Sequence, residues 1–136
     1  EAILKDPGLR TDIPLARMKD PEMETSMALS VLAHALSFHL HHDEYRRQQA
    51  GSEWRQIYGV EPERRVVTLL GLGAMGRSAA VALRDAGFRV AALVRSPRPG
   101  EIETFGFDQL DTRLAETDVK QDVVGSLQCH TRRKAG

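Results

Sequence analysis

Three glycines in the middle of the chain constrain its fold more than any other feature. They form a G-x-G-x-x-G pattern at residues 71–76, read as GLGAMG. The apolar run RVVTLL precedes the pattern at residues 65–70, as a buried parallel strand would. A strand, a tight glycine turn and a helix in this order open a βαβ unit. The sequence therefore predicts an α/β fold with a partial Rossmann-type parallel sheet.

The residues after the pattern continue this unit. A helix is expected at residues 75–86, where the apolar residues share one face, and Gly87 suits a left-handed helix stop. A second buried strand, RVAALV, is expected at residues 89–94, and residues 95–100 contain two prolines and should form a loop. A short helix is expected at residues 108–116. Beyond it the pattern weakens, because Lys120-Gln121-Asp122 interrupts the strand character of Val119 and Val123-Val124.

The glycine pattern suits a dinucleotide pyrophosphate. Gly71 permits a tight turn, Gly73 lets the backbone approach a phosphate, and Gly76 allows the helix to pack against the sheet. The helix N-terminus offers free N–H groups, and the amides around Ala74 and Met75 are the expected donors. The alternative is a glycine-rich turn that holds no ligand.

The end of the second expected strand bears on the choice of dinucleotide. An acidic residue about 20 positions past the loop would bind the ribose hydroxyls of NAD. This chain has Arg95, Ser96 and Arg98 there, and its nearest acid is Glu101. Arginine pairs with a phosphate bidentately, whereas a carboxylate repels it. The sequence thus favours NADP, with NAD as the alternative cofactor and a solvated basic loop as the alternative reading of the arginines.

The N-terminal part contains helices and turns. Residues 1–22 are rich in turn signals, including Asp20-Pro21, which is expected to begin a helix over residues 22–42. Apolar residues recur along this helix at spacings of three and four, namely Met27, Val31, Ala35 and Phe38, widened by Leu32 and Leu36. A shorter polar helix is expected at residues 43–50, and a polar connector at residues 59–64.

Composition excludes several classes of function. The 136 residues fit one domain, and equal numbers of basic and acidic residues, 19 each, give no sign of a nucleic-acid-binding field. A single cysteine, Cys129, cannot form an internal disulfide or a CxxC site, so a reducing, cytoplasmic setting is the expectation. No membrane span is expected. His34, His39, His41 and His42 lack the spacing of a zinc motif, and a partly exposed helix end is the simpler interpretation.

The segment VVTLLGLGAMGRSAAVALRDAGFRVAALVRSPR resembles the cofactor domain of the D-isomer-specific 2-hydroxyacid dehydrogenases. The stretch DPEM followed by a long helix, and the motif formed by Tyr45, Gln48-Gln49 and Trp54, are similar to the glyoxylate/hydroxypyruvate reductase A-like branch. This resemblance implies a two-domain enzyme that reduces a small 2-keto acid with NAD(P)H. It also implies a homodimer formed through the helix from Met23 to Leu40.

Carried onto this chain, the resemblance assigns the cofactor-binding residues. The loop residues Leu72, Gly73, Ala74, Met75 and Gly76 would face the pyrophosphate after the turn at Gly71, and Arg95, Ser96 and Arg98 would face the ribose 2′-phosphate. The catalytic arginine, glutamate and histidine of the family would lie downstream of this chain. No catalytic residue and no metal ligand is therefore expected within it.

The expected organisation follows from these patterns. Residues 1–22 would be a loop-rich remnant of the connection between domains, 23–58 a helical interface segment, 59–118 a Rossmann βαβ NAD(P)-binding unit and 119–136 a divergent tail. The tail VKQDVVGSLQCHTRRKAG lacks the Leu-Pro-x-Thr loop of the family, so it is either a displaced strand or unrelated sequence. We expect a fragment that is inactive alone and marginally stable, with a sheet of two or three strands. The alternative is a non-catalytic dinucleotide-binding or helix-mediated dimerisation module.

Overall fold

The strand that precedes the glycine pattern lies at the centre of the sheet. The structure, a computed structural model, describes residues 7–8, 14, 20–122 and 129–131. In it, β1 (Val66–Leu70) pairs in parallel with β2 (Arg89–Leu93) on one side and with β4 (Val119–Asp122) on the other. β3 (Glu103–Phe105) extends the sheet in parallel beyond β2, and β5 (Cys129–Thr131) adds an antiparallel edge beyond β4. The order β3-β2-β1-β4-β5 confirms the predicted α/β fold with a Rossmann-type parallel sheet.

The expected parallel sheet of two or three strands is too small, since among the described residues four strands pair in parallel and β5 adds a fifth, antiparallel strand. β3 was not predicted, because three residues show no periodicity. The polar residues Lys120-Gln121-Asp122 do not interrupt a strand but lie within β4. Their backbones pair with β1 on one side and, in part, with β5 on the other, which sets their conformation whatever their polarity. Val123-Val124 lies outside the described residues.

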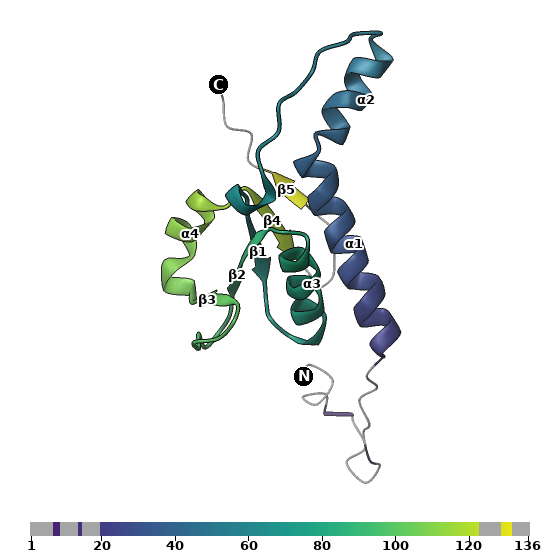
Figure 1. The fold of residues 1–136 in the computed structure, drawn as a ribbon. Coiled ribbons are helices and arrows are strands. Elements are labelled where there is room, and N and C mark those ends of the chain that lie inside the picture. The colour runs from purple at the N-terminus through teal and green to yellow at the C-terminus, as the bar shows by residue number, and fades with distance from the viewer. Residues whose placement is uncertain (1–6, 9–13, 15–19, 123–128, 132–136) are drawn as a thin grey trace.

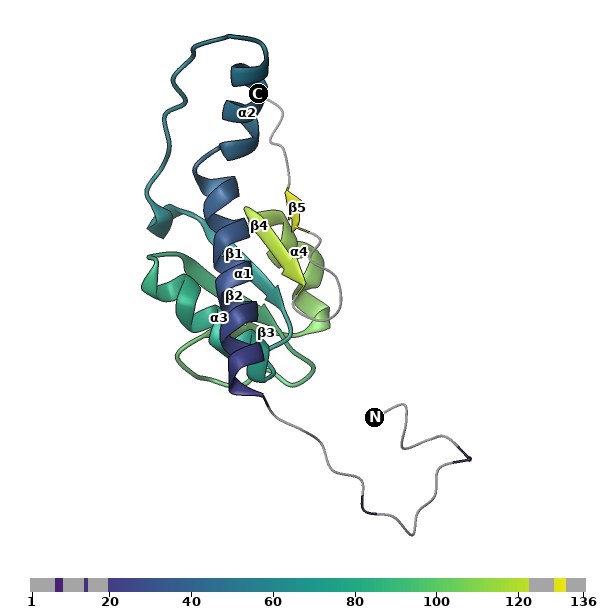
Figure 2. The same cartoon turned by 90° about the vertical axis from the view of Figure 1, so that its right-hand side faces the viewer.

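Helices cover both faces of this sheet (Figures 1 and 2). α1 (Pro21–His39) and α3 (Ala74–Asp85) pack together on one face, and α4 (Leu110–Glu116) covers the other. The larger core lies on the side of α1 and α3, and its fully buried members include Val31, Leu69 and Leu83. A smaller core around Leu93 and Phe105 lies beneath α4. Burying a side chain of this size stabilises the fold by about 1.5–3 kcal/mol.

The apolar stripe of α1 faces the body of the chain. Its buried residues Val31 and Ala35 belong to the same core as Ala79 and Ala80 of α3, whose small side chains let the two helices approach closely. The other four stripe residues are partly buried against this core: Met27, Leu32, Leu36 and Phe38. The spacing of the hydrophobic residues along α1 is therefore explained by packing within the chain.

The two ends of α1 have local causes. Asp20 is the N-cap, and its carboxylate accepts hydrogen bonds from the backbone N–H groups of Glu22 (3.0 Å) and Met23 (3.3 Å). The helix ends at His39, three residues before the expected end, because His41 adopts a left-handed conformation with φ of +56°. This turn directs the chain into α2 (His42–Ala50), close to the predicted second helix.

α2 and the returning residues 51–61 form an arm that extends beyond the sheet (Figure 1). The hydroxyl of Tyr45 accepts a hydrogen bond from the N–H of Ile57 (3.1 Å) and donates one to its carbonyl oxygen (3.3 Å). The buried side chain of Gln48 accepts a hydrogen bond from the N–H of Arg55 (3.0 Å). These bonds fasten the returning segment along α2, and η2 (Pro62–Arg64) then leads into β1.

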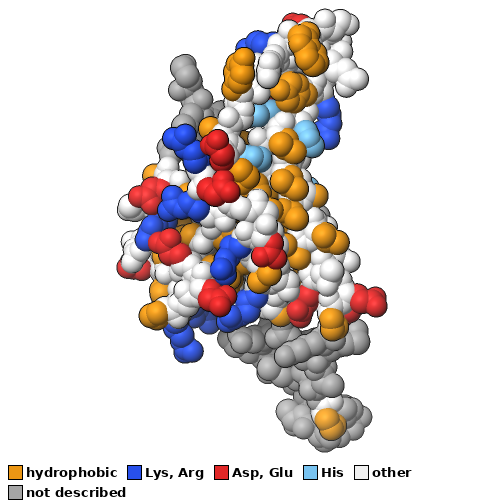
Figure 3. Space-filling model, viewed as in Figure 1, with side chains coloured by type: hydrophobic (Ala, Val, Ile, Leu, Met, Phe, Trp, Pro, Cys, Tyr) orange, Lys and Arg blue, Asp and Glu red, His pale blue; other side chains and the backbone are white. Residues whose placement is uncertain are grey.

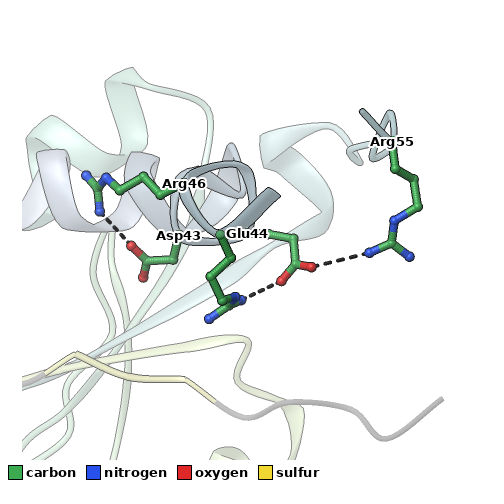
Figure 4. A network of polar contacts seen from close by, with 5 residues as sticks. Asp43, Glu44, Arg46 and Arg55 are labelled. Carbon is green, nitrogen blue, oxygen red and sulfur yellow. Dashed lines mark hydrogen bonds and ion pairs between the residues drawn. The ribbon is translucent and has the colours of Figure 1, made fainter. Parts of the chain in front are cut away.

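Ion pairs add to this arrangement of the arm. Glu44 accepts from Arg47 on its own helix and from Arg55 of the returning segment (3.3 Å), while Arg46 pairs with Asp43 at 2.7 Å (Figure 4). Pairs this exposed contribute about 0–1 kcal/mol each. The hydrogen bonds of Tyr45 and Gln48 therefore define the arm more than its charges do.

Candidate functional site

The glycine loop joins β1 to α3 at the carboxyl edge of the parallel strands. Gly71 has φ of +110°, a conformation that side chains with a Cβ rarely adopt. Its N–H donates to the carbonyl oxygen of Leu93 at the end of β2, at 3.0 Å. Gly73 is the N-cap of α3, with an ordinary φ of −73°. The loop thus follows β1 at the point where the strand order reverses, between β1 and β4, which is where ligands bind in folds of this kind.

The three glycines differ in what surrounds them. A Cβ atom added at Gly71 or Gly73 would meet no atom within 4 Å, so the backbone there is open on its outer side. Gly76 is buried, and its α-carbon faces the carbonyl group of Gly71 at a distance that leaves no room for a side chain. The first two glycines therefore keep space for a ligand, and the third permits contact between helix and loop.

The first turn of α3 offers backbone donors. The first intrahelical hydrogen bond runs from the N–H of Arg77 to the carbonyl oxygen of Gly73 (2.9 Å). The amides of Ala74, Met75 and Gly76 precede it and have no helical carbonyl to pair with. They lie where the helix dipole favours an anion. The hydroxyl of Ser78 is occupied differently, because it donates to the carbonyl oxygen of Ala74 (3.3 Å).

An open groove of about 720 Å³ lies beside the loop, between α3 and the segment that follows β2. Leu72 belongs both to the glycine loop and to the groove wall. The predicted residues Arg95, Ser96 and Arg98 line the groove together. Its other lining residues come from α3, from the end of β2 and from the segment leading into β3: Arg77, Val81, Arg84, Val94, Pro99, Gly100, Glu101, Ile102 and Thr104.

The groove carries an excess of positive charge. Among its four arginines, Arg84 pairs with Glu101 at 3.3 Å, and Glu101 is the only acidic residue in the lining. In the part of the chain that the structure describes, Arg77, Arg95 and Arg98 form no ion pair. Basic side chains also gather at the lower edge of the body in the space-filling view (Figure 3). Three arginines without an acidic partner therefore surround one space, which suits a phosphate group.

Sequence reasoning missed the two arginines that α3 contributes, Arg77 and Arg84. Both positions follow the glycine pattern within one predicted helix. Arg77 comes directly after Gly76, so it lies in the first turn of a helix whose N-terminus points at the expected ligand. That position was a usable signal. No such signal marks Thr104 as a lining residue of the groove, because its position depends on β3, a strand that the sequence does not predict.

The histidines form no such cluster. Among the described residues, no three His, Cys, Asp or Glu side chains lie close enough to hold a metal ion. The Nδ1 atom of His34 lies 2.7 Å from the carbonyl oxygen of Ser30 on the same helix. His39 is buried with its ring edge-on to Phe88, at 5.3 Å between centroids. Burial above all, and then the neighbouring Arg65 and His41, lower the pKa of His39, although Glu63 opposes them.

The comparison with protein families matches this arrangement. Residues 32–124 match the model of the D-isomer specific 2-hydroxyacid dehydrogenase NAD binding domain. The chain belongs to the D-isomer specific 2-hydroxyacid dehydrogenase family. The matched residues of the chain include both the glycine loop and the groove. None of the helices among its described residues combines the length and the apolar character that a membrane span requires.

Individual relatives place this chain within the family. It is 34% identical to glyoxylate/hydroxypyruvate reductase A of Photorhabdus laumondii over 126 residues, which are 88% of this chain and 40% of that protein. Its structure is similar to a D-isomer specific 2-hydroxyacid dehydrogenase from Xanthobacter autotrophicus solved with NADPH, with a TM-score of 0.80, 28% identity and coverage of 89% of this chain and 50% of the other.

A third relative is the NADPH-dependent glyoxylate/hydroxypyruvate reductase of Sinorhizobium meliloti, solved with NADP and sulfate. It has a TM-score of 0.77 and 33% identity, and the match covers 88% of this chain and 38% of that one. The chain thus spans about two-fifths of the length of the curated relative from Photorhabdus laumondii. The resemblance to the glyoxylate/hydroxypyruvate reductase A branch is confirmed.

Proposed function

We propose that this chain is the NADP-binding part of a reductase that acts on a small 2-keto acid. The observation that carries the proposal is the groove beside the glycine loop, where Arg77, Arg95 and Arg98 have no acidic partner among the described residues. NADP differs from NAD by one phosphate on the adenosine ribose, and arginine is the side chain that pairs best with that group.

The residues present fit both ends of the adenosine diphosphate part. The open backbone from Gly71 to Met75 would bind the pyrophosphate through its amides, while Gly76 keeps α3 against the loop. Arg95, Ser96 and Arg98 would bind the 2′-phosphate, and Leu72 would lie between the two sites. The resemblance to the family implies the same assignment for Gly73, Ala74 and Met75 at the pyrophosphate, and for Arg95, Ser96 and Arg98 at the 2′-phosphate.

The charges of the groove favour NADP over NAD, which remains the alternative cofactor. NAD-specific folds of this type place a carboxylate at the end of the second strand to accept hydrogen bonds from the ribose. Here that position is Arg95, and the carboxylate nearest to it along the sequence, Glu101, is already paired with Arg84. The arginines of the groove would therefore attract a 2′-phosphate, and no unpaired carboxylate among the lining residues would repel it.

The substrate class rests on the relatives. Two of them are named glyoxylate/hydroxypyruvate reductases, so a small 2-keto acid such as glyoxylate or hydroxypyruvate is the proposed substrate of the whole enzyme. When bound, NADPH supplies the hydride for that reduction. The residues of this chain would bind and orient the cofactor. We propose that the chain has no activity alone and that the whole enzyme acts in the cytoplasm.

We also propose that the chain forms a homodimer through the outer side of the helix from Met23 to Leu40 together with the arm. The stripe of α1 is occupied by α3, but Met23, Leu29 and Leu40 remain about half exposed or more. On the arm, Trp54 and Tyr58 are exposed by 93% and 85%. In Figure 3, hydrophobic side chains gather over α1 and the arm, while charged side chains dominate the rest of that face.

Titration of this chain with NADPH and NADH tests the cofactor assignment, and a glyoxylate reduction assay follows it. NADPH should bind more tightly than NADH, and Arg95→Ala should weaken NADPH binding much more than NADH binding. Equal losses for the two cofactors would refute the 2′-phosphate site. Cofactor binding without turnover, even when the remainder of a full-length relative is supplied, would favour the second candidate, a non-catalytic dinucleotide-binding or dimerisation module.

A further inference from the structure

One threonine hydroxyl holds the middle of the arginine-bearing loop. The N–H of Arg98 donates to the Oγ1 atom of Thr104 at 3.1 Å, and the same hydroxyl donates to the carbonyl oxygen of Arg98 at 2.9 Å. A hydroxyl has a single proton to donate and lone pairs to accept with, so this pair of bonds uses its donor and one acceptor site. Both backbone polar groups of Arg98 are therefore fixed by Thr104.

Thr104 is itself well anchored. It is the central residue of β3 and pairs with Ala92 of the buried strand β2. Its neighbour Glu103 forms an ion pair with Arg113 of α4 at 2.7 Å. Below the loop, the N–H of Val94 donates to the carbonyl oxygen of Phe105 at 2.9 Å and closes its base. The hydroxyl thus connects the edge strand β3 to a loop that is otherwise exposed.

The two prolines in the loop make the contact with Thr104 important for the conformation of Arg98. Arg98 lies between Pro97 and Pro99, which have no N–H to donate and a φ fixed near −65°. Within this tripeptide, the N–H of Arg98 is the only backbone donor, and Thr104 accepts it. The prolines limit the conformations of the loop, and Thr104 selects one of them.

We propose that Thr104 is a positioning residue that sets the preference for NADP by holding Arg98 at the groove. The proposal rests on the proposed function, since it assumes that the groove binds the 2′-phosphate. Thr104 need not touch the phosphate itself. A loop that is already ordered loses less conformational entropy when its arginine pairs with a ligand, so ordering by Thr104 appears as affinity for the phosphorylated cofactor.

Two substitutions separate this role from the packing of β3. Thr104→Val keeps the shape of the side chain and removes the hydroxyl, whereas Thr104→Ser keeps the hydroxyl. Each variant of the full chain is titrated with NADPH and NADH, and with adenosine 2′,5′-bisphosphate and AMP, which probe the adenosine end alone. Losing two hydrogen bonds of ordinary strength should weaken binding of the two 2′-phosphorylated ligands by about 5- to 20-fold. NADH and AMP should change by less than about twofold, and Thr104→Ser should restore the preference.

The outcomes distinguish this inference from the proposed function. If Arg95→Ala lowers the preference for NADPH and Thr104→Val does not, the positioning role is refuted and the proposed function stands. An equal loss for NADPH and NADH in Thr104→Val refutes it as well, because that indicates damage to the fold. If Arg95→Ala leaves the preference unchanged, the proposed function fails and this inference fails with it.

A second route covers a Thr104→Val chain that does not fold. The double variant Pro97→Gly/Pro99→Gly loosens the same segment without altering β3. Loss of the preference for NADPH in this variant, with Thr104→Ser unchanged from wild type, supports positioning by the ordered loop. An unchanged preference overturns it.

Discussion

A Cβ atom on Gly76 would lie closer than 3.0 Å to the carbonyl oxygen of Gly71. No real side chain tolerates that distance, and the obstacle is backbone, which cannot rotate away as a flexible side chain would. The two glycines are therefore one unit, in which the left-handed conformation of Gly71 brings its carbonyl group against the first turn of α3. The loop can be this tight only while residue 76 lacks a side chain.

Gly76→Ala should therefore destabilise the chain. Overpacking of this kind costs about 1–3 kcal/mol, and the better helix propensity of alanine returns up to about 1 kcal/mol. The net loss in the free energy of unfolding should be about 1–2 kcal/mol, measured by urea denaturation. A variant as stable as the wild type would mean that loop and helix separate easily.

Gly73→Ala is the matched control and a prediction of its own. Its Cβ would meet no atom within 4 Å, and φ at this position is −73°, so the free energy of unfolding should be almost unchanged. The same methyl group enters the space proposed for the pyrophosphate. NADPH and NADH should both bind roughly tenfold more weakly, which corresponds to about 1.4 kcal/mol. Unchanged affinity for both cofactors would place the pyrophosphate elsewhere.

Elements that have a strong local sequence pattern could be predicted. β1, α3 and β2 follow from apolar runs and from glycines whose roles are local, and Gly87 ends the helix region with φ of +90° as expected. β3 and β4 could not be predicted in this way. Their strand conformation comes from pairing with β2 and β1, which are distant in sequence, and the polar residues of β4 conceal it.

The same distinction applies to the site. Arg95, Ser96 and Arg98 were predicted because they follow a recognisable strand, and the structure brings them into one groove. Arg77 and Thr104 reach that groove from a helix and from an unpredicted strand. Trp54 belongs to the motif that carries the resemblance, yet its exposure of 93% excludes it from the core of this chain. Such placements depend on tertiary packing, which periodicity does not report.

Arg77→Gln should lower the affinity for NADPH more than the affinity for NADH. Arg77 has no ionic partner among the described residues, so its charge is free to meet the 2′-phosphate, and losing a charged hydrogen bond costs about 1.5–3 kcal/mol, or roughly 10- to 150-fold in dissociation constant. Arg84→Gln is the matched control. It removes an arginine from the same helix and groove, but one that Glu101 already neutralises. A larger effect at Arg84 than at Arg77 would contradict this assignment of charges.

The stability of the chain should fall as the pH drops from neutrality through the usual titration range of histidine, because of His39. Burial first, with help from Arg65 and His41 and against the effect of Glu63, lowers the pKa of His39 from its ordinary value in the folded chain. The unfolded chain therefore takes up a proton at pH values where the folded chain does not, and acid favours unfolding. Above the pKa that His39 has in the unfolded chain, His39 is uncharged in both states, and none of this stability is lost. Urea denaturation as a function of pH measures it, and His39→Gln should flatten the dependence in this window. An identical slope for the two proteins would exclude His39 as its source.

Self-association should depend on the arm. Trp54 and Tyr58 make little contact with their own chain, and truncating them should leave the unfolding free energy of the monomer within about 0.5 kcal/mol. If they are anchors in a partner copy, Trp54→Ala should cost about 2 kcal/mol of dimerisation free energy, roughly a 30-fold rise in the dissociation constant. Sedimentation velocity over a range of concentrations gives this constant.

Phe107→Ala is the matched control for this measurement. Phe107 is also a large exposed side chain, at 65%, but it lies in η3 (Phe107–Gln109), which leads into α4 on the other side of the sheet. Removing it should leave the dimer unchanged if association uses α1 and the arm. Equal effects of the two substitutions would indicate non-specific hydrophobic association. A wild-type chain that stays monomeric throughout would refute the homodimer.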